Sequence, residues 1–185
     1  MSRLFFALPL PEAALIALER AQHEAKPAAA RLAPRWTRPE QMHVTLKFLG
    51  EQPDTALPGL RAALAARARA ARPIEATLAR VAAFGGQRAR ILVAELESQG
   101  GGLGQLAAGL EADAAELGVE RETRPFVAHV TLARFRHPGD ARAVIAAATL
   151  EPTALRFTEA CLYRSELSPA GSRYAVIERC PLGEV

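Results

Sequence analysis

The chain has 185 residues, half of them apolar, and a formal net charge of +3. This length can bury a substantial core, and no stretch approaches the run of about 20 apolar residues that crosses a bilayer. The small positive charge excludes a protein that coats nucleic acid and suits a small anionic ligand or one end of a nucleic acid. Because the apolar N-terminal segment is too short for a signal peptide, we expect a cytoplasmic protein with no membrane contact.

Apolar periodicity divides the first half of the chain into strands and helices. Pro11 suits the first turn of a helix, and Pro73 ends a second one. The loop between the first helix and the second strand is basic and carries the sole tryptophan, Trp36. The predicted elements are a strand over 4–8, a helix over about 11–25, a loop over 26–40, a strand over 42–49, a helix over about 56–71 and a strand over 74–84.

The same order then restarts. The predicted elements are a strand over 90–96, a helix over about 103–118, a strand over 127–135, a helix over about 139–148, a strand over 155–167, a turn over 168–171 and a strand over 172–179. Each half thus has the order strand, helix, strand, helix, strand, which favours an α+β or α/β class. We interpret 1–185 as a single domain with half-repeats of approximately 1–88 and 89–185.

A four-residue motif occurs once in each half, at His43-Val44-Thr45-Leu46 and at His129-Val130-Thr131-Leu132. Histidine is scarce, because the chain has four in all, and we expect the other two, His23 and His137, to be surface residues. Side chains alternate between the faces of a strand, so the histidine and threonine of each motif project together while the apolar residues face the core. Two such strands on one cleft would present two imidazoles and two hydroxyls to a ligand.

The flanks of the two motifs also correspond. Arg35-Trp36-Thr37-Arg38-Pro39 precedes the first motif, and Arg121-Glu122-Thr123-Arg124-Pro125 precedes the second, while Lys47 and Arg134 lie just beyond the threonines. With these flanks, the chain resembles the two-histidine (2H) phosphoesterase superfamily, and most closely its RNA 2′,3′-cyclic phosphodiesterases, formerly described as 2′-5′ RNA ligases. That resemblance implies an α+β, bilobal, pseudo-symmetric fold in which each lobe is an antiparallel sheet covered by helices. A central cleft would carry both motifs.

The resemblance also implies an activity: hydrolysis of a 2′,3′-cyclic phosphate at an RNA or nucleotide terminus to a 2′-phosphomonoester, with no metal and no cofactor. By position, His43 and His129 are the catalytic pair, and Thr45 and Thr131 hold the phosphate. Arg134 matches a basic residue of the family's site, whereas no role transfers to Lys47. From the residues themselves, Phe48 and Trp36 are candidates to stack a base, although packing in the core is the commoner fate of aromatic side chains.

Two opposed imidazoles suit this chemistry. Water must be deprotonated as it attacks phosphorus, and the departing ribose oxygen must be protonated on the opposite side. An ordinary pKa near 6.5 allows one neutral and one protonated histidine to coexist near neutral pH. Symmetric motifs do not say which is which; our working assignment is His43 as acid and His129 as base.

Other interpretations stay open. The histidines could instead bind a metal, but no Asp, Glu or Cys accompanies them at ligand spacing. A catalytically idle binder of RNA termini, cleavage of another phosphoester, and reversible 2′-5′ ligation are further alternatives. We expect a monomer acting on RNA that ends in 2′,3′-cyclic phosphate or on cyclic nucleotides, with Cys161 and Cys180 as free thiols.

Overall fold

The structure, a computed structural model, describes residues 1–168 and 171–183. Within these residues, nine antiparallel strands form one sheet in the order β7-β4-β5-β6-β3-β1-β8-β9, with β2 paired to β6. The strands are β1 Ser2–Pro9, β2 Pro34–Trp36, β3 His43–Gln52, β4 Ile74–Phe84, β5 Ala89–Ser98, β6 His129–Gly139, β7 Thr153–Phe157, β8 Glu159–Ser168 and β9 Gly171–Pro181. The α-helices are α1 Glu12–Ala29, α2 Leu57–Ala70, α3 Gly102–Glu116 and α4 Arg142–Ala147.

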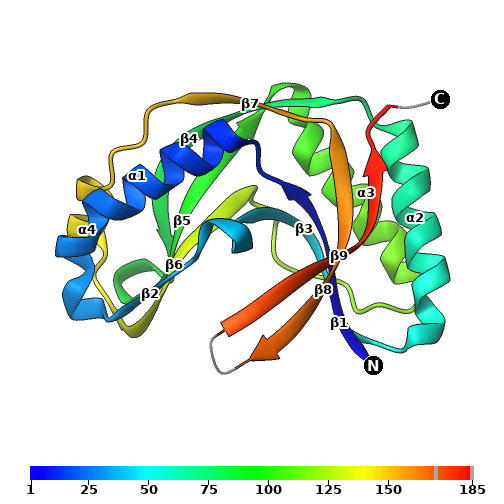
Figure 1. The fold of residues 1–185 in the computed structure, drawn as a ribbon, viewed down its shortest axis with the longest axis horizontal. Coiled ribbons are helices and arrows are strands. Elements are labelled where there is room, and N and C mark those ends of the chain that lie inside the picture. Colours follow the sequence, from blue (N-terminus) through cyan, green and yellow to red (C-terminus); the bar gives the residue numbers. More distant parts are fainter. Residues whose placement is uncertain (169–170, 184–185) are drawn as a thin grey trace.

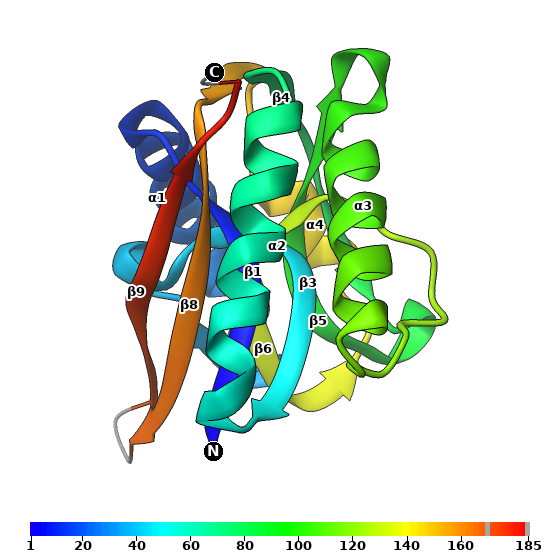
Figure 2. The same ribbon diagram turned by 90° about the vertical axis from the view of Figure 1, so that its right-hand side faces the viewer.

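The sheet divides into two lobes at its centre. Among the described residues, β3 and β6 pair through a single residue pair, Val44 with Val130, and separate on either side of it. The first lobe contains β7, β4, β5 and β6 with α1 and α4 packed on it, and the second contains β3, β1, β8 and β9 with α2 and α3 (Figures 1 and 2). The architecture is α+β, as predicted.

Elements cross between the lobes. Helix α1 comes from the first half of the chain but packs against β7 and α4, and α3 comes from the second half but packs against β3 (Figure 1). Strand β4 likewise joins β5 and β7 in the first lobe, while β8 joins β1 in the second. Each spatial lobe is therefore assembled from both sequence halves.

The core lies between the sheet and its helices. The helices bury leucine and alanine at helical spacing, such as Leu60, Leu64 and Ala68 of α2, all fully buried. Small alanine side chains let the helices approach the sheet, and each buried leucine contributes roughly 1.5–3 kcal/mol. The opposite, concave face of the second lobe carries a smaller cluster made by Phe5, Ala7, Cys161 and Tyr163, with Tyr174 against it.

Several element boundaries differ from the sequence prediction. The loop predicted over 26–40 contains β2, which forms because it pairs with β6, and the helix predicted over about 139–148 is only Arg142–Ala147, because β6 stays paired with β5 as far as Gly139. Helix α1 continues to Ala29 despite Pro27, because the last turn still buries Ala25 and Ala29 and proline sacrifices one helical hydrogen bond near the end. The single strand predicted over 155–167 is two strands, β7 and β8, because the chain leaves the first lobe after Phe157 and enters the second. The turn predicted over 168–171 falls partly outside the described residues.

Cys161 and Cys180 are both buried and free. Cys161 faces the concave cluster, and Cys180 pairs in register with Ala160 and belongs to the helix-side core. The two thiols therefore lie on opposite faces of the sheet and form no disulfide. Within the described residues, no helix combines the length and apolarity needed to span a membrane.

Candidate functional site

A β-bulge in β3 decides which side chains reach the concave face. Along β1, Phe5 pairs with Phe48, Phe6 with Lys47 and Ala7 with Thr45, so Leu46 is the extra residue. Alternation therefore resets after the motif. Leu46 and Lys47 are both buried toward the helices, and Phe48 turns to the side that also carries His43 and Thr45.

Strand β6 has the same bulge at the equivalent place. Leu92 of β5 pairs with Ala133 and Val93 with Thr131, which leaves Leu132 as the extra residue. Ala133 is fully buried, and Arg134 faces the concave side. The structural counterpart of Arg134 is thus Phe48, five residues after its histidine, and not Lys47.

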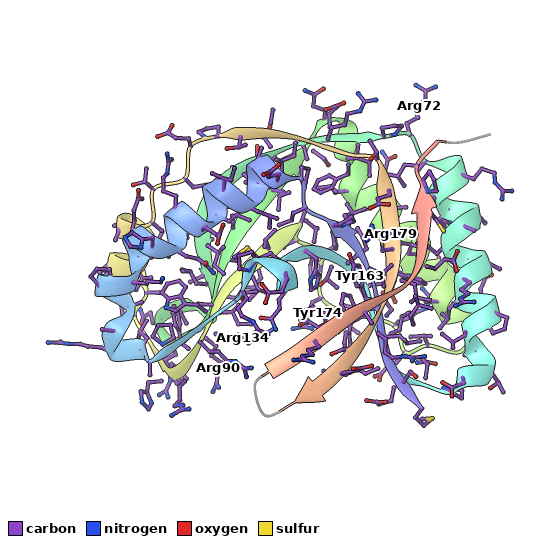
Figure 3. The ribbon with its side chains drawn as sticks, viewed as in Figure 1. Arg72, Arg90, Arg134, Tyr163, Tyr174 and Arg179 are labelled. Carbon is purple, nitrogen blue, oxygen red and sulfur yellow. The ribbon has the colours of Figure 1, made fainter. Side chains whose placement is uncertain are left out.

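A cavity of about 390 Å³ lies on this concave face between the lobes. Its lining brings together every site residue that the sequence predicted: His43, Thr45, Phe48, His129, Thr131, Arg134 and Trp36. Trp36 is half-buried and packs against the core as well as lining the cavity, so the structure shows the packing role, and base stacking stays a prediction. Figure 3 shows Arg134 and Tyr174 on facing sides of the space between the lobes.

Sequence reasoning missed other residues of the lining. Arg3 and Phe5 come from β1, Tyr174 comes from β9, and Gln41 precedes the first motif. Their place in the site depends on strand pairing, because β1 pairs directly with β3, and β9 is joined to β1 through β8. The Arg3 guanidinium lies 4.8 Å from the centre of the Phe48 ring, and Phe48 is 47% exposed where it lines the cavity.

The central strand pair sets the motifs in a crossed arrangement. Because β3 and β6 run antiparallel through Val44 and Val130, His43 lies on the same side of that pair as Thr131. Thr45 correspondingly lies on the same side as His129. Each histidine is therefore grouped with the threonine of the other motif, which is the arrangement that two copies related by a twofold axis produce.

Both imidazoles are anchored in the same way. His43 Nδ1 lies 2.8 Å from the carbonyl oxygen of Gln41, and His129 Nδ1 lies 2.7 Å from that of Val127. A carbonyl can only accept, so Nδ1 carries the proton and donates it. The second ring nitrogen, Nε2, is then left as the site of proton exchange in each histidine.

Aromatic rings surround His43. Phe5 stacks on the imidazole with the ring centres 4.8 Å apart, and Tyr163 stacks on Phe5 at 5.1 Å with its own ring centre 6.0 Å from that of His43. Tyr174 meets His43 edge-on at 5.1 Å. Burial among these rings lowers the pKa of His43 from 6.5 to about 4, while the bond to the Gln41 carbonyl opposes the shift and the His129 charge adds to it.

His129 has a different setting. Phe84 contacts it edge-on at 4.9 Å. Burial lowers its pKa first of all, the hydrogen bond to Val127 raises it, the Arg134 charge lowers it and the Glu95 carboxylate raises it. Both histidines therefore favour the neutral form, chiefly because they are buried, and the charge of the Arg134 guanidinium adds to this effect at His129.

Among residues 1–168 and 171–183, no three His, Cys, Asp or Glu side chains gather closely enough to hold a metal ion. The groups that line the cavity include two imidazoles, the hydroxyls of both motif threonines and three guanidinium groups, those of Arg3, Arg35 and Arg134. Such a set can exchange protons and bind a tetrahedral anion.

Comparison with known proteins shows the family of the chain. The sequence profile of the 2′-5′ RNA ligase superfamily matches residues 5–169. The chain belongs to this superfamily. An RNA 2′,3′-cyclic phosphodiesterase of Thermus thermophilus is 36% identical, over 97% of this chain and 90% of the relative.

Solved structures of similar proteins have the same fold. The protein TT0787 of Thermus thermophilus superposes with a TM-score of 0.83 at 32% identity, covering 98% of both chains. Escherichia coli LigT in complex with 3′-AMP gives a TM-score of 0.71 at 29% identity, covering 99% of both chains.

Proposed function

We propose that this protein hydrolyses the 2′,3′-cyclic phosphate of RNA termini or nucleotides to a 2′-phosphomonoester, as an RNA 2′,3′-cyclic 3′-phosphodiesterase. The observation that carries the proposal is the pair of imidazoles in one cavity, each anchored through Nδ1 and each with Nε2 available. The activity named for the Thermus thermophilus relative supports it, because that protein is similar along nearly its whole length.

The proposed reaction moves one proton at each imidazole. Neutral Nε2 of one histidine takes a proton from water as the water oxygen bonds to phosphorus. The bond from phosphorus to the ribose 3′ oxygen breaks, and the protonated Nε2 of the other histidine donates to that oxygen. The product carries a 2′-phosphate and a 3′-hydroxyl, and the carbonyls that accept from Nδ1 stabilise whichever imidazole is charged.

The other cavity residues fit the transition state. Hydroxyls of Thr45 and Thr131 can donate to the two non-bridging oxygens, whose negative charge grows as water attacks. The Arg134 guanidinium adds fixed positive charge. In this scheme Phe48 offers a half-exposed ring for stacking the terminal base.

The division of labour between the histidines is carried over from the sequence, because burial lowers the pKa of both imidazoles and leaves both neutral before substrate binds. Our working assignment keeps His43 as the acid and His129 as the base. A phosphate anion in the cavity raises the pKa of both imidazoles, and protonation of His43 then occurs when substrate binds. Before binding, a neutral His129 with a lowered pKa is ready to act as a base.

The direct test is incubation with a nucleoside 2′,3′-cyclic phosphate in the presence of a chelator, followed by identification of the product isomer. We expect the 2′-phosphate. Formation of the 3′-phosphate would reverse the leaving group and with it the roles of the histidines. Loss of turnover on chelation, restored by zinc or manganese, would contradict the proton-transfer mechanism.

A catalytically idle binder is the alternative from another class. The two anchored Nε2 atoms argue against it, since recognition of a phosphate needs no pair of proton carriers. Affinity and turnover measured on the same cyclic-phosphate oligonucleotide separate the two: tight binding with no product would support the binder. Ligation of RNA halves is the reverse of a related step and is tested with a 2′,3′-cyclic phosphate and a 5′-hydroxyl end.

A further inference from the structure

Lys47 is the one charged side chain that is buried among the described residues, with 4% of its surface exposed. The bulge in β3 turns it away from the cavity and toward α3. At the equivalent place in β6 stands Ala133, which is also buried. The fold therefore accepts an apolar side chain at this position in the second copy of the motif. Burying the charge of Lys47 instead costs free energy unless the partners of the ammonium group are well placed.

The partners of Lys47 are well placed. Its ammonium lies 2.8 Å from Oε2 and 3.0 Å from Oε1 of Glu111 on α3, and it donates to the carbonyl of Glu120 at 2.7 Å. Glu111 Oε1 also accepts from the backbone N–H of Glu122 at 3.1 Å. The ion pair therefore holds two points of the segment 118–128, which connects α3 to the second motif.

That segment has few other attachments. Side chains 120–127 are all exposed, and the described residues there form no helix or strand. Figure 2 shows the chain leaving the end of α3 and looping beside the helix before it enters the sheet. Fixing residues 120 and 122 shortens the free stretch to the few residues before Ala128, whose carbonyl accepts from Leu96 in β5.

The free stretch ends in a functional contact. The carbonyl of Val127 is the acceptor for Nδ1 of His129, so the path of the segment decides where that acceptor lies. Lys47, two residues after Thr45 in the first motif, is in this way connected to the histidine of the second motif. A displacement of about 1 Å in a reacting group can lower a rate by ~10²-fold.

We propose that Lys47 and Glu111 are positioning residues for His129, holding the segment 118–128 so that the Val127 carbonyl fixes the ring and its tautomer. This inference rests on the proposed function for its effect on turnover, and its effect on the ring is independent of any substrate. The pair acts through the backbone and touches no reacting atom.

Three variants test the proposal: Lys47→Met, Glu111→Gln and the double variant Lys47→Met with Glu111→Leu. In Lys47→Met we expect kcat to fall roughly tenfold, with KM within about twofold, because the His129 ring is displaced while the groups that bind the substrate stay in place. The double variant replaces both charges by apolar groups, which restores thermal stability, while the tether stays absent and kcat stays low.

The decisive readout is the tautomer of each histidine, from ¹⁵N chemical shifts of the imidazole nitrogens in the free protein. Lys47→Met should leave His43 as it is and give His129 a mixture of Nδ1–H and Nε2–H forms. A matched control is Arg67→Ala, which removes a half-exposed ion pair of α2 with Asp113 on the same α3 and should change neither histidine.

Recovery of kcat together with stability in the double variant would show a purely structural role and overturn the proposal. So would an unchanged His129 tautomer in both Lys47→Met and the double variant. If the wild-type protein turns over no cyclic phosphate, the proposed function fails, and the tautomer measurement still decides the positioning role.

Discussion

The two copies of the motif have the same geometry and different surroundings. Phe5 of β1 and Ile91 of β5 occupy equivalent places, since they pair with Phe48 and Arg134 respectively. His43, in the second lobe, is therefore enclosed by aromatic rings, whereas His129, in the first lobe, lies near the Arg134 guanidinium. Repetition of a motif supplies two proton carriers, and the unrepeated neighbours make them chemically unequal.

The largest effect should come from removing either imidazole. We expect His43→Ala and His129→Ala each to lower kcat by about 10²–10⁴-fold, because each removes one proton transfer. Initial rates on a nucleoside 2′,3′-cyclic phosphate measure it, with His23→Ala as an exposed-histidine control. If either variant keeps more than roughly a tenth of the wild-type rate, paired acid–base catalysis is wrong.

The enclosure of His43 should also appear in stability. Its pKa is lowered from 6.5 to about 4, so the folded protein resists protonation there. This contribution to the free energy of unfolding is fully present above pH 6.5, the pKa of His43 in the unfolded chain. It is lost as the pH falls through about 4, the pKa in the folded protein, and amounts to roughly 3 kcal/mol in all. Unfolding free energies in urea from pH 7 to pH 4 measure it. In His43→Gln the part of the slope between those two pKa values should be missing, and an unchanged slope would contradict the enclosure.

Substitutions of Arg134 and Phe48, which occupy equivalent positions in β6 and β3, should have the next largest effects. Arg134→Ala should lower kcat/KM by about 10–100-fold, since hydrogen bonds to charged groups contribute ~1.5–3 kcal/mol. The same change removes a charge that lowers the pKa of His129, so the acidic limb of the pH profile should move upward. Phe48→Ala should raise KM roughly fivefold or more with kcat retained. An unmoved limb in Arg134→Ala would separate this guanidinium from His129.

The smallest effect concerns the edge-on ring of Tyr174. Tyr174→Leu keeps an apolar side chain but admits water, so the pKa of His43 should rise toward 6.5 by about one unit or less. NMR titration of the imidazole measures this shift. Tyr174→Phe keeps the ring and serves as the control; an equal shift in both variants would assign the effect to the hydroxyl instead of to burial.

Much of the site was predictable from local pattern. Each histidine and threonine two residues apart on a strand had to share a face, and Val44 and Val130 had to face the core, where both are fully buried. The same alternation misplaces the residues after each threonine, because it puts Lys47 on the face of Thr45. A one-residue bulge leaves no mark in the sequence, since it depends on how β1 and β5 pair alongside.

The exchange of elements between lobes was equally beyond local pattern. Periodicity shows that α1 and α3 each have an apolar face, but not which lobe of the sheet that face packs against. Side-chain type and spacing were enough to predict the alternation of strands and helices in each half and the residues able to move protons, but not β2 or the division of 155–167 into β7 and β8. The tertiary structure alone decided that the two halves interleave, that aromatic rings enclose one histidine, and that Lys47 faces α3, because each depends on contacts between segments far apart in the chain.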